Sequence, residues 1–359
     1  MKAAICYEFN KPLVIEEIEI DPPQAGELKV RLAACAICHS DIHAIEGAWG
    51  GSLPVVYGHE AAGIVEEVGP RVTLAKPGDH VVVSLLRSCG HCYFCTQGES
   101  HVCATTFALD NENRIHSKDG QSIHQGLRTG AFAEYVVVDE SQVVQIPEAM
   151  SLDSASLLAC GVITGLGAVV NTAEVPSGSS VVVIGTGGVG LNSVQGAVLC
   201  GAHPIIAIDL LNSKLEAAKA FGATHTVNLT EENAEATVYS LTQGRGADYV
   251  FVTVGSAKAI EQSMGLLRRA GTLVIVGMPP SGVKAEIEAV DFAFNSQRVL
   301  GSKMGSTRLR VDVPKLVELY EQGWLKLDEL ITGRYRLEEI NEAIAAVNRS
   351  EALRNVIVF

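Results

Sequence analysis

The sequence has few aromatic residues and no excess of positive charge. Aromatic residues make up 5% of its 359 residues, and 27 lysines and arginines stand against 41 aspartates and glutamates, which gives a formal net charge of −14. Proteins that follow a nucleic-acid backbone concentrate positive charge, and those that bind single strands add aromatic stacking platforms. The composition therefore predicts no nucleic-acid partner.

Long hydrophobic runs are also missing. No apolar run approaches the roughly 18 to 20 residues that a membrane-spanning helix needs. The first residues, MKAAICYEFNKPLVIEE, contain three glutamates and lack the apolar core of a secretory signal. The chain is 47% hydrophobic and 19% charged, so it can fill a sizeable core, and its length is typical of two domains. We expect a cytoplasmic protein with no membrane partner.

The nine cysteines are unevenly placed. In the cytoplasm they are expected to be thiols or metal ligands, because glutathione keeps most pairs reduced. The stretch CGHCYFCTQGESHVC has the spacing C-x2-C-x2-C-x7-C, which lets a short loop surround a tetrahedral zinc ion with all four positions filled. Such a site would stabilise the loop and take no part in catalysis. Two disulfides, four unrelated thiols or an iron–sulfur cluster remain alternatives. The four cysteines are Cys89, Cys92, Cys95 and Cys103.

Two patterns along the chain predict two kinds of domain. Residues 28–135 contain β-branched runs broken by glycine, which indicate a compact β-rich domain. Within them, 104–131 shows no apolar periodicity and is expected to be a long surface loop. After Gly161 the chain alternates apolar strands with helical segments, as in a doubly wound, Rossmann-type parallel sheet. The six expected strands are Val181–Gly185, Ile205–Asp209, His225–Asn228, Tyr249–Gly255, Thr272–Gly277 and Arg298–Lys303.

The GTGGVG segment lies where the first of these strands ends and a helix begins. Gly185 would permit the tight turn, Gly187 would let the backbone approach a pyrophosphate, and Gly190 would let the helix pack on the strand. Gly188 and Val189 complete the turn, and the helix N-terminus would offer N–H groups to the phosphates. A glycine-rich turn without a cofactor is the alternative.

Asp209 ends the next strand, nineteen residues after Gly190. A carboxylate there can accept hydrogen bonds from both adenosine ribose hydroxyls and would repel a 2′-phosphate, so NAD is favoured over NADP. Lys214 could reach the same ribose, although a solvated lysine at a helix start is an equally good interpretation.

Three dispersed residues could form a second metal site. Two thiolates and one imidazole, from Cys38, Cys160 and His59, would leave one position of a tetrahedral zinc open, as a catalytic zinc requires. Glu60 adjoins His59. Spacing alone does not show that these residues meet, and each could be an ordinary core residue.

The sequence resembles the zinc-dependent medium-chain alcohol dehydrogenases, especially the liver-type and glutathione-dependent formaldehyde dehydrogenase branch. The similarity runs in order over nearly the whole chain. The segments that carry it are CHSDIHAIEG, GHEAAGIVEEVG, PGDHV, CGHCYFC, FAEYVVV, LLACGVITGLGAVVNTA, GTGGVGL, VIVGMPP, VPKLVELY and LRNVIVF.

The resemblance implies a GroES-like catalytic domain in two segments, 1–161 and 305–359, around an NAD-binding Rossmann domain at 162–304. It implies two zinc ions per chain. Cys38, His59 and Cys160 would bind the catalytic ion and the cysteine quartet the structural one. Glu60 would be a carboxylate able to coordinate the catalytic zinc transiently, and Asp41 would accept a hydrogen bond from His59.

The resemblance also assigns the proton path and several cofactor contacts. Ser40 would take the alcohol proton and His43 would pass it to solvent through the nicotinamide ribose. Thr164 would lie near the nicotinamide, and His39 and Arg354 near the pyrophosphate. Each of these polar residues could also be an ordinary surface residue. The remaining expected cofactor contacts are Val254, Val276 and Met278.

The expected substrate pocket is only partly defined. By the resemblance, Trp49, Leu85 and Met278 line the alcohol cleft and Met304 lies near the domain junction. The bulk of Trp49 would restrict the space near the zinc, although a tryptophan in this glycine-rich loop could equally cover the core.

Together these features predict reversible hydride transfer between an alcohol and NAD+ through a zinc-bound alkoxide. One alternative is a glutathione-dependent formaldehyde dehydrogenase, which would need a basic anchor such as Arg114, Lys118 or Arg128. Polyol and amino-alcohol dehydrogenases are others, and a non-enzymatic zinc-stabilised protein is disfavoured because the relay residues are present. The small-molecule partner would be an alcohol or aldehyde, and a homodimer and a homotetramer both remain open.

Overall fold

A computed structural model describes all residues, 1–359, as two compact units. Met1–Cys160 and Arg308–Phe359 form the first unit, and Gly161–Thr307 form the second. The chain thus leaves the first unit, builds the second and returns. The boundaries expected from the sequence lay at 161/162 and 304/305.

One sheet of the first unit closes into a small barrel. Its strands pair in the order β1-β2-β7-β8-β4, and β1 closes the ring by pairing with β4. A closed ring has no unpaired strand edge. The barrel strands are β1 (Lys2–Cys6), β2 (Val14–Ile20), β4 (Val55–Val56), β7 (Ile115–Ser117) and β8 (Ser122–Gln125).

This barrel corrects the expectation of a structureless loop at 104–131. Ile115 and Ile123 are almost fully buried and face each other across β7 and β8. The two strands are too short to show a period of two in a segment that is otherwise polar. Their pairing with β2 and β4 makes them part of the domain core.

The second sheet of this unit has seven strands in the order β10-β6-β5-β3-β18-β17, with β9 paired to β3. It joins the two sequence segments of this unit, because the C-terminal β18 pairs antiparallel with β3. β17 was not expected from the sequence. The strands are β3 (Glu27–Ala36), β5 (Glu60–Val68), β6 (His80–Ser84), β9 (Tyr135–Asp139), β10 (Val143–Gln145), β17 (Ile331–Arg336) and β18 (Arg354–Val358).

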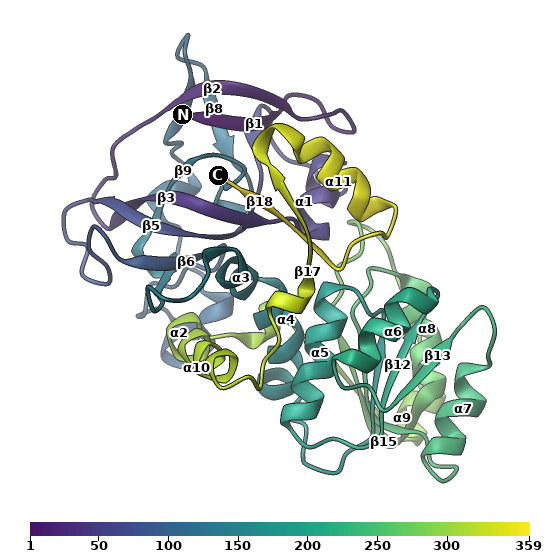
Figure 1. The fold of residues 1–359 in the computed structure, drawn as a ribbon. Helices are drawn as coiled ribbons and strands as arrows, with labels where there is room; N and C mark the ends of the chain where they lie inside the picture. The colour runs from purple at the N-terminus through teal and green to yellow at the C-terminus, as the bar shows by residue number, and fades with distance from the viewer. The chain divides into compact units, whose positions relative to one another are not determined.

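Helices of the first unit cover these sheets, and α11 contacts both β17 and β18 (Figure 1). The two amphipathic helices expected in the final stretch are α10 and α11. The helices are α1 (His39–Ile45), α2 (Tyr93–Thr96), α3 (Leu152–Ser156), α10 (Leu309–Glu321) and α11 (Ile340–Asn348).

The second unit is the predicted six-stranded parallel sheet. Its order is β13-β12-β11-β14-β15-β16, and every neighbouring pair is parallel. The central strand β11 is buried along its whole length, as expected for a strand covered on both faces. The strands are β11 (Val181–Ile184), β12 (Ile205–Asp209), β13 (His225–Asn228), β14 (Ala247–Val252), β15 (Leu267–Ile275) and β16 (Arg298–Gly301).

Helices connect and flank this sheet (Figure 1). The helix after the glycine turn begins at Gly188, and the next ends before Gly222, whose φ of 112° suits the position after a C-cap. The helices are α4 (Gly161–Gly167), continued by a π-helical turn at Ala168–Thr172, then α5 (Gly188–Leu199), α6 (Asn212–Ala220), α7 (Ala234–Leu241), α8 (Ala257–Ser263) and α9 (Ala289–Phe294).

None of the helices is long and apolar enough to cross a bilayer by itself. The segments Leu152–Ala159 and Gly161–Thr172 meet the length and composition criteria only as a bent pair.

A buried ion pair connects the barrel to the seven-stranded sheet. Arg114, next to β7, donates from Nε and Nη2 to the two carboxylate oxygens of Glu27 on β3, at 2.9 and 2.7 Å. Both side chains are more than 90% buried. Lys118, four residues along, pairs with Glu17 at the surface instead.

Replacing Arg114 with Ala should destabilise the fold by about 3 to 5 kcal/mol, because it leaves the Glu27 carboxylate buried without its partner. Urea unfolding followed by circular dichroism measures the change. Lys118→Ala in the same segment is the control and should leave the unfolding midpoint unchanged, since exposed ion pairs contribute little. Equal midpoints for both variants would mean that the buried pair does not hold the barrel in place.

Candidate active site and cofactor sites

Four dispersed residues converge in the first unit. Ligand atoms of Cys38, His59, Glu60 and Cys160 all lie within 4.8 Å of one another, and all four side chains are buried. These residues span more than 120 positions of sequence, so only the fold brings them together. The three ligands expected for a catalytic zinc and the adjacent carboxylate thus form one cluster.

The carboxylate of Asp41 orients this cluster. Its Oδ1 lies 2.8 Å from His59 Nδ1 and accepts a hydrogen bond from the N–H of Gly58, and its Oδ2 accepts from the N–H of Cys38. Asp41 and His59 are both fully buried. The carboxylate favours the tautomer with the proton on Nδ1, which leaves Nε2 as the ligand atom.

The local structure around each ligand explains its position. Cys38 is the N-cap residue of α1, and Asp41 in the first turn returns the capping hydrogen bond to its backbone. His59 directly precedes β5, on a turn where a Cβ at Gly58 would lie 2.6 Å from the Phe132 nitrogen. The Ser84 hydroxyl, at the end of β6, donates to the Ala159 carbonyl at 2.7 Å and so fixes the segment before Cys160.

The donor set suits a zinc ion. His59 Nε2 is buried and has no hydrogen-bond partner in the protein. A hydrogen bond from Cys160 and the nearby His59 hold the pKa of Cys38 well below its usual range. Two thiol ligands and one imidazole are the set found in open zinc sites, and none of the nine cysteines forms a disulfide.

Glu60 forms an ion pair inside the protein. Its Oε2 accepts a hydrogen bond from Arg354 Nη2 at 2.5 Å, and both side chains are buried. Burial raises the pKa of Glu60 to about 7, against the opposing effect of Arg354. The second oxygen, Oε1, has no hydrogen-bond partner. Arg354 was expected at the cofactor pyrophosphate, and the contact that the structure gives it is this pair with Glu60.

Ser40 and His43 lie one turn apart on α1. His43 Nδ1 lies 3.6 Å from Glu46 Oε2, and the Trp49 ring meets the imidazole edge-on at 5.8 Å. Trp49 also packs against the hydrophobic core of this unit. Both interpretations of Trp49, cover for the core and neighbour of the site, are therefore compatible with its contacts.

Two further expected site residues have less specific surroundings. His39, the first residue of α1, is exposed and could reach a ligand from outside. Leu85 directly follows β6 and is half-buried. Ser84 was not predicted from the sequence, because a serine at the end of a strand carries no signal for the contact that it makes.

The cysteine quartet forms a second cluster around α2. The sulfur atoms of Cys89, Cys92, Cys95 and Cys103 lie within 4.8 Å of one another. Partial burial raises the pKa of Cys89, but hydrogen bonds from Thr105 and from the N–H groups of His91 and Cys92 outweigh it and lower the pKa to about 5. Four sulfur donors fill a tetrahedral shell and leave no position for a substrate.

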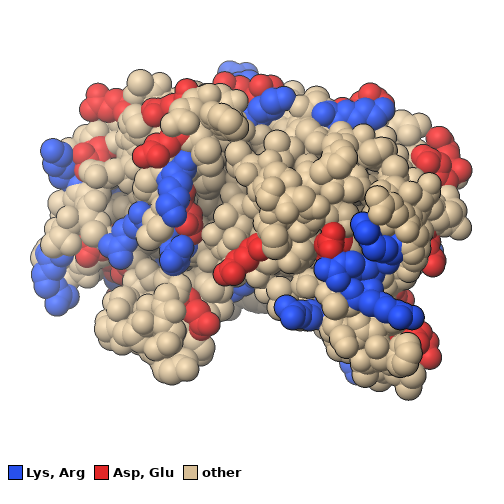
Figure 2. Space-filling model, turned by 90° about the horizontal axis from the view of Figure 1, so that it is seen from below, with Lys and Arg blue, Asp and Glu red and all other residues tan.

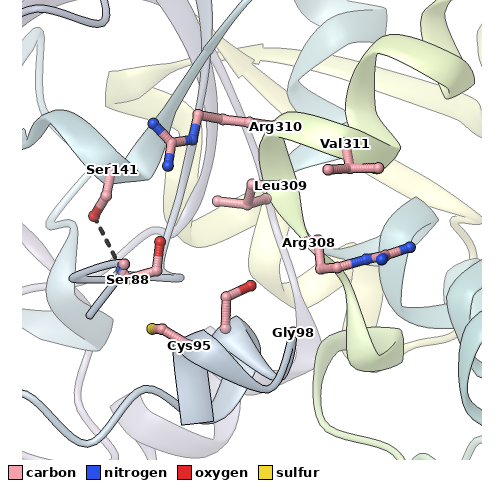
Figure 3. A pocket seen from close by; sticks show the side chains of 10 residues that line it. Ser88, Cys95, Gly98, Ser141, Arg308, Leu309, Arg310 and Val311 are labelled. Carbon is pink, nitrogen blue, oxygen red and sulfur yellow. Dashed lines mark hydrogen bonds between the residues drawn. The ribbon is translucent and has the colours of Figure 1, made fainter. Parts of the chain in front are cut away.

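A cavity of about 200 Å³ lies beside this quartet, between its loop and the start of α10 (Figure 3). The N–H of Ser88 donates to Ser141 Oγ across one side of it, and Leu309 and Val311 supply apolar lining. None of the residues that line it belongs to the Cys38 cluster. It is therefore separate from the expected alcohol pocket.

In the glycine turn of the second unit, each of the three motif glycines lacks a side chain for a different structural reason. Gly185 has a φ of 88° and its Cβ would lie 2.4 Å from Val254 Cγ1. A Cβ at Gly190 would lie 1.8 Å from the Gly185 carbonyl oxygen, so α5 can pack there only without a side chain. A Cβ at Gly187 would meet nothing within 4 Å, which leaves this backbone open to a ligand.

Asp209 lies at the end of β12, as expected, and its carboxylate is already bound from within. Oδ2 accepts from the N–H and the hydroxyl of Thr186, and Oδ1 accepts from the N–H groups of Leu210 and Leu211. Lys214 lies on the first turn of α6 and is half-buried. Thr186 was not predicted as a site residue, although its hydroxyl inside a glycine motif was the available signal.

The residues expected near the nicotinamide fall into buried and exposed groups. The Thr164 hydroxyl, on α4, donates to the Met304 sulfur at 3.7 Å, and both side chains are buried. Val276 is buried, whereas Val254 and Met278 are exposed. Exposed apolar side chains beside the glycine turn are available to a bound ring.

Charged side chains show no simple segregation by sign on the face drawn in Figure 2. Basic and acidic side chains alternate over much of this face, and one group of basic side chains gathers at its right-hand side. This local group contrasts with the net charge of −14 of the whole chain.

Comparisons with known proteins agree with both units. Residues 24–148 match the family model of the alcohol dehydrogenase GroES-like domain, and residues 188–322 match that of zinc-binding dehydrogenases. The structure is similar to that of a benzyl alcohol dehydrogenase from Acinetobacter calcoaceticus, with a TM-score of 0.94 and 31% identity over 100% of this chain and 99% of that one.

Two curated relatives match over essentially their whole lengths. A class-3 alcohol dehydrogenase from Cereibacter sphaeroides is 37% identical over 100% of this chain and 99% of its own. An S-(hydroxymethyl)glutathione dehydrogenase from Saccharomyces cerevisiae is 38% identical over 99% of this chain and 95% of its own. The chain therefore belongs to the zinc-dependent medium-chain alcohol dehydrogenase family and is an NAD-dependent oxidoreductase of this family.

Proposed function

We propose that Cys38, His59 and Cys160 hold the catalytic zinc of an alcohol dehydrogenase that interconverts an alcohol and its aldehyde or ketone with NAD+. The observation that carries the proposal is that the ligand atoms of these three buried residues lie close together. One of them, His59 Nε2, has no hydrogen-bond partner in the protein. A zinc ion held there would supply Lewis-acid polarisation of the substrate oxygen. The cysteine quartet would hold a second, structural zinc.

The second unit would bind NAD through the glycine turn and Asp209. The open backbone at Gly187 and the N-terminus of α5 suit a pyrophosphate, and the Asp209 carboxylate suits a ribose with free hydroxyls. Gly188 and Val189 begin α5, and Lys214 lies near the same carboxylate in sequence. Bound NAD would supply the hydride acceptor, and the chain's own residues would hold and orient it. Thr164, Val254, Val276, Met278 and Met304 remain proposed neighbours of the nicotinamide or pocket.

The proton of the alcohol would leave along α1. Ser40 stands two residues after Cys38 and can accept the proton from the substrate hydroxyl, and His43 can pass it outward because its side chain is 30% exposed. Asp41 holds His59 in one tautomer throughout. Trp49 restricts the orientation of the His43 ring, and Leu85 and Trp49 would bound the alcohol pocket. His39 and Arg354 remain proposed phosphate contacts, and Glu60 a proposed transient ligand.

An alcohol without a glutathione moiety is the proposed substrate. Of the three basic residues considered as anchors for an anionic substrate, Arg114 is buried against Glu27, and Lys118 is paired with Glu17. Arg128 lies 3.5 Å from Asp110. Aromatic alcohols are of interest because one structural neighbour is a benzyl alcohol dehydrogenase. Glutathione-dependent formaldehyde oxidation is the alternative, since a relative has that name.

Localisation and assembly are further proposals. The absence of disulfides among nine cysteines supports a reducing compartment such as the cytoplasm. A homodimer or homotetramer would use one of the two edges of the sheet in the second unit, the edge that β16 forms. A second copy of this edge could pair antiparallel with it about a two-fold axis. The exposed Val290 and Phe294 on the neighbouring α9 would be covered by the same contact.

We expect two zinc ions per chain in the purified protein by elemental analysis. Cys160→Ser should reduce the content to one and abolish activity, because it opens the catalytic donor set. Cys103→Ser, the matched change in the other cluster, should also leave one zinc but lower the thermal stability, since a structural zinc contributes folding energy. Two zinc ions in the Cys160→Ser variant would refute the assignment of the catalytic site.

Replacing His43 with Gln should lower kcat roughly tenfold, because water can still carry the proton away. Removing a base that acts directly on the substrate would lower kcat by about 100-fold. The loss should be greatest at low pH, while NAD binding changes little. Steady-state kinetics across pH and calorimetric titration with NAD+ measure both. His116→Gln is the control, because this imidazole is 29% exposed and also faces a carboxylate, outside the site. An unchanged pH profile for His43→Gln would remove it from the path.

Primary, secondary and aromatic alcohols, tested with NAD+ through NADH absorbance, should be oxidised without glutathione. Formaldehyde with glutathione should give no greater turnover than the best simple alcohol, because the basic side chains considered as anchors are already paired. A rate with S-(hydroxymethyl)glutathione far above every simple alcohol would reverse this order. Activity with none of these substrates would reject the proposed reaction.

A further inference from the structure

Thr186 connects the glycine turn to the residue that ends the neighbouring strand. It is the second residue of GTGGVG, between β11 and α5, and is completely buried. Its N–H donates to Asp209 Oδ2 at 2.7 Å and its hydroxyl donates to the same oxygen at 3.0 Å. The backbone bond is available to any residue except proline at this position, whereas the second bond requires a hydroxyl.

The other oxygen of Asp209 is held on the exposed side. Oδ1 accepts from the N–H groups of Leu210 and Leu211 at 2.7 and 3.2 Å, and both of these residues are exposed. Donors on both oxygens fix the plane of this group, which can only accept hydrogen bonds. The buried oxygen thus faces Thr186, and the other lies where a ligand from outside can reach it.

We propose that Thr186 is a positioning residue that sets the preference of this site for NAD over NADP. This inference rests on the proposed function, in which Asp209 binds the adenosine ribose. Because Thr186 has no exposed surface, it acts on the cofactor only through the carboxylate that it holds. A carboxylate fixed from behind presents its oxygen to the ribose hydroxyls and cannot turn away from a 2′-phosphate.

The expected size of the effect follows from the type of hydrogen bond. A hydrogen bond to a charged group is stronger than one between neutral groups, so its loss should be measurable as a change in affinity. Part of the contribution is retained, because the Thr186 N–H still binds the same oxygen. We therefore expect about a fivefold to tenfold loss in NAD+ affinity when the hydroxyl is removed.

The matched pair Thr186→Val and Thr186→Ser separates the hydroxyl from the shape of the side chain. Valine keeps the branched shape without the hydroxyl, and serine keeps the hydroxyl. Calorimetric titration of the zinc-loaded protein with NAD+ and with NADP+ should show weaker NAD+ binding and a smaller ratio of NAD+ to NADP+ affinity for Thr186→Val. Thr186→Ser should remain within about twofold of the unmodified protein. In kinetics, the KM for NAD+ should rise in Thr186→Val while kcat stays the same.

Asp209→Asn distinguishes failure of this inference from failure of the proposed function. If Asp209→Asn keeps the full preference for NAD+, the ribose assignment is wrong and the role of Thr186 falls with it. If Asp209→Asn loses the preference but Thr186→Val keeps it, only the role of Thr186 is refuted. Thermal unfolding of the cofactor-free variants checks the fold, and Thr186→Ala replaces the valine variant if the latter does not fold.

Discussion

The buried carboxylate of Asp41 is the group on which the catalytic cluster depends. It accepts hydrogen bonds from the N–H groups of Cys38 and Gly58 and contacts His59 Nδ1. These contacts fix the start of α1 and the turn before β5 relative to each other. An uncompensated buried charge would be costly, so Asp41 requires all of its partners. The same arrangement leaves His59 Nε2 facing two thiols, which is the geometry that a zinc ion needs.

The two cysteine-containing clusters illustrate two uses of the same ligand chemistry. The quartet lies in one short loop around α2 and could surround an ion with little help from the rest of the fold. The Cys38 cluster depends on several elements, including the Ser84 contact that holds the chain before Cys160. A closed shell stabilises a loop, whereas an incomplete shell built on rigid elements allows chemistry.

The sequence predicted the second unit almost completely. Four apolar runs became the inner strands, because a parallel strand covered on both faces is apolar along its length and is easily recognised. The two segments proposed as outer strands, His225–Asn228 and Arg298–Lys303, became the edge strands β13 and β16. The glycine turn was recognised equally well from the sequence. Its glycines are required by the packing, since a Cβ at Gly190 would collide with the Gly185 carbonyl oxygen. The first unit was harder to predict from the sequence. The strands β7 and β8 are short and lie in a polar segment, so their role in the barrel could not be read from periodicity.

By itself, the sequence determined the residue types that do chemistry and the local turns that present them, because glycine motifs, cysteine spacing and apolar runs depend on nearby residues. Only the tertiary structure decided which distant groups meet. It brought Cys160 to Cys38 and His59, directed Arg354 to Glu60 and placed the Thr186 hydroxyl on Asp209. Such contacts depend on strand order and on the burial of each polar group with its partner, and neither is encoded in the spacing of residues along the chain.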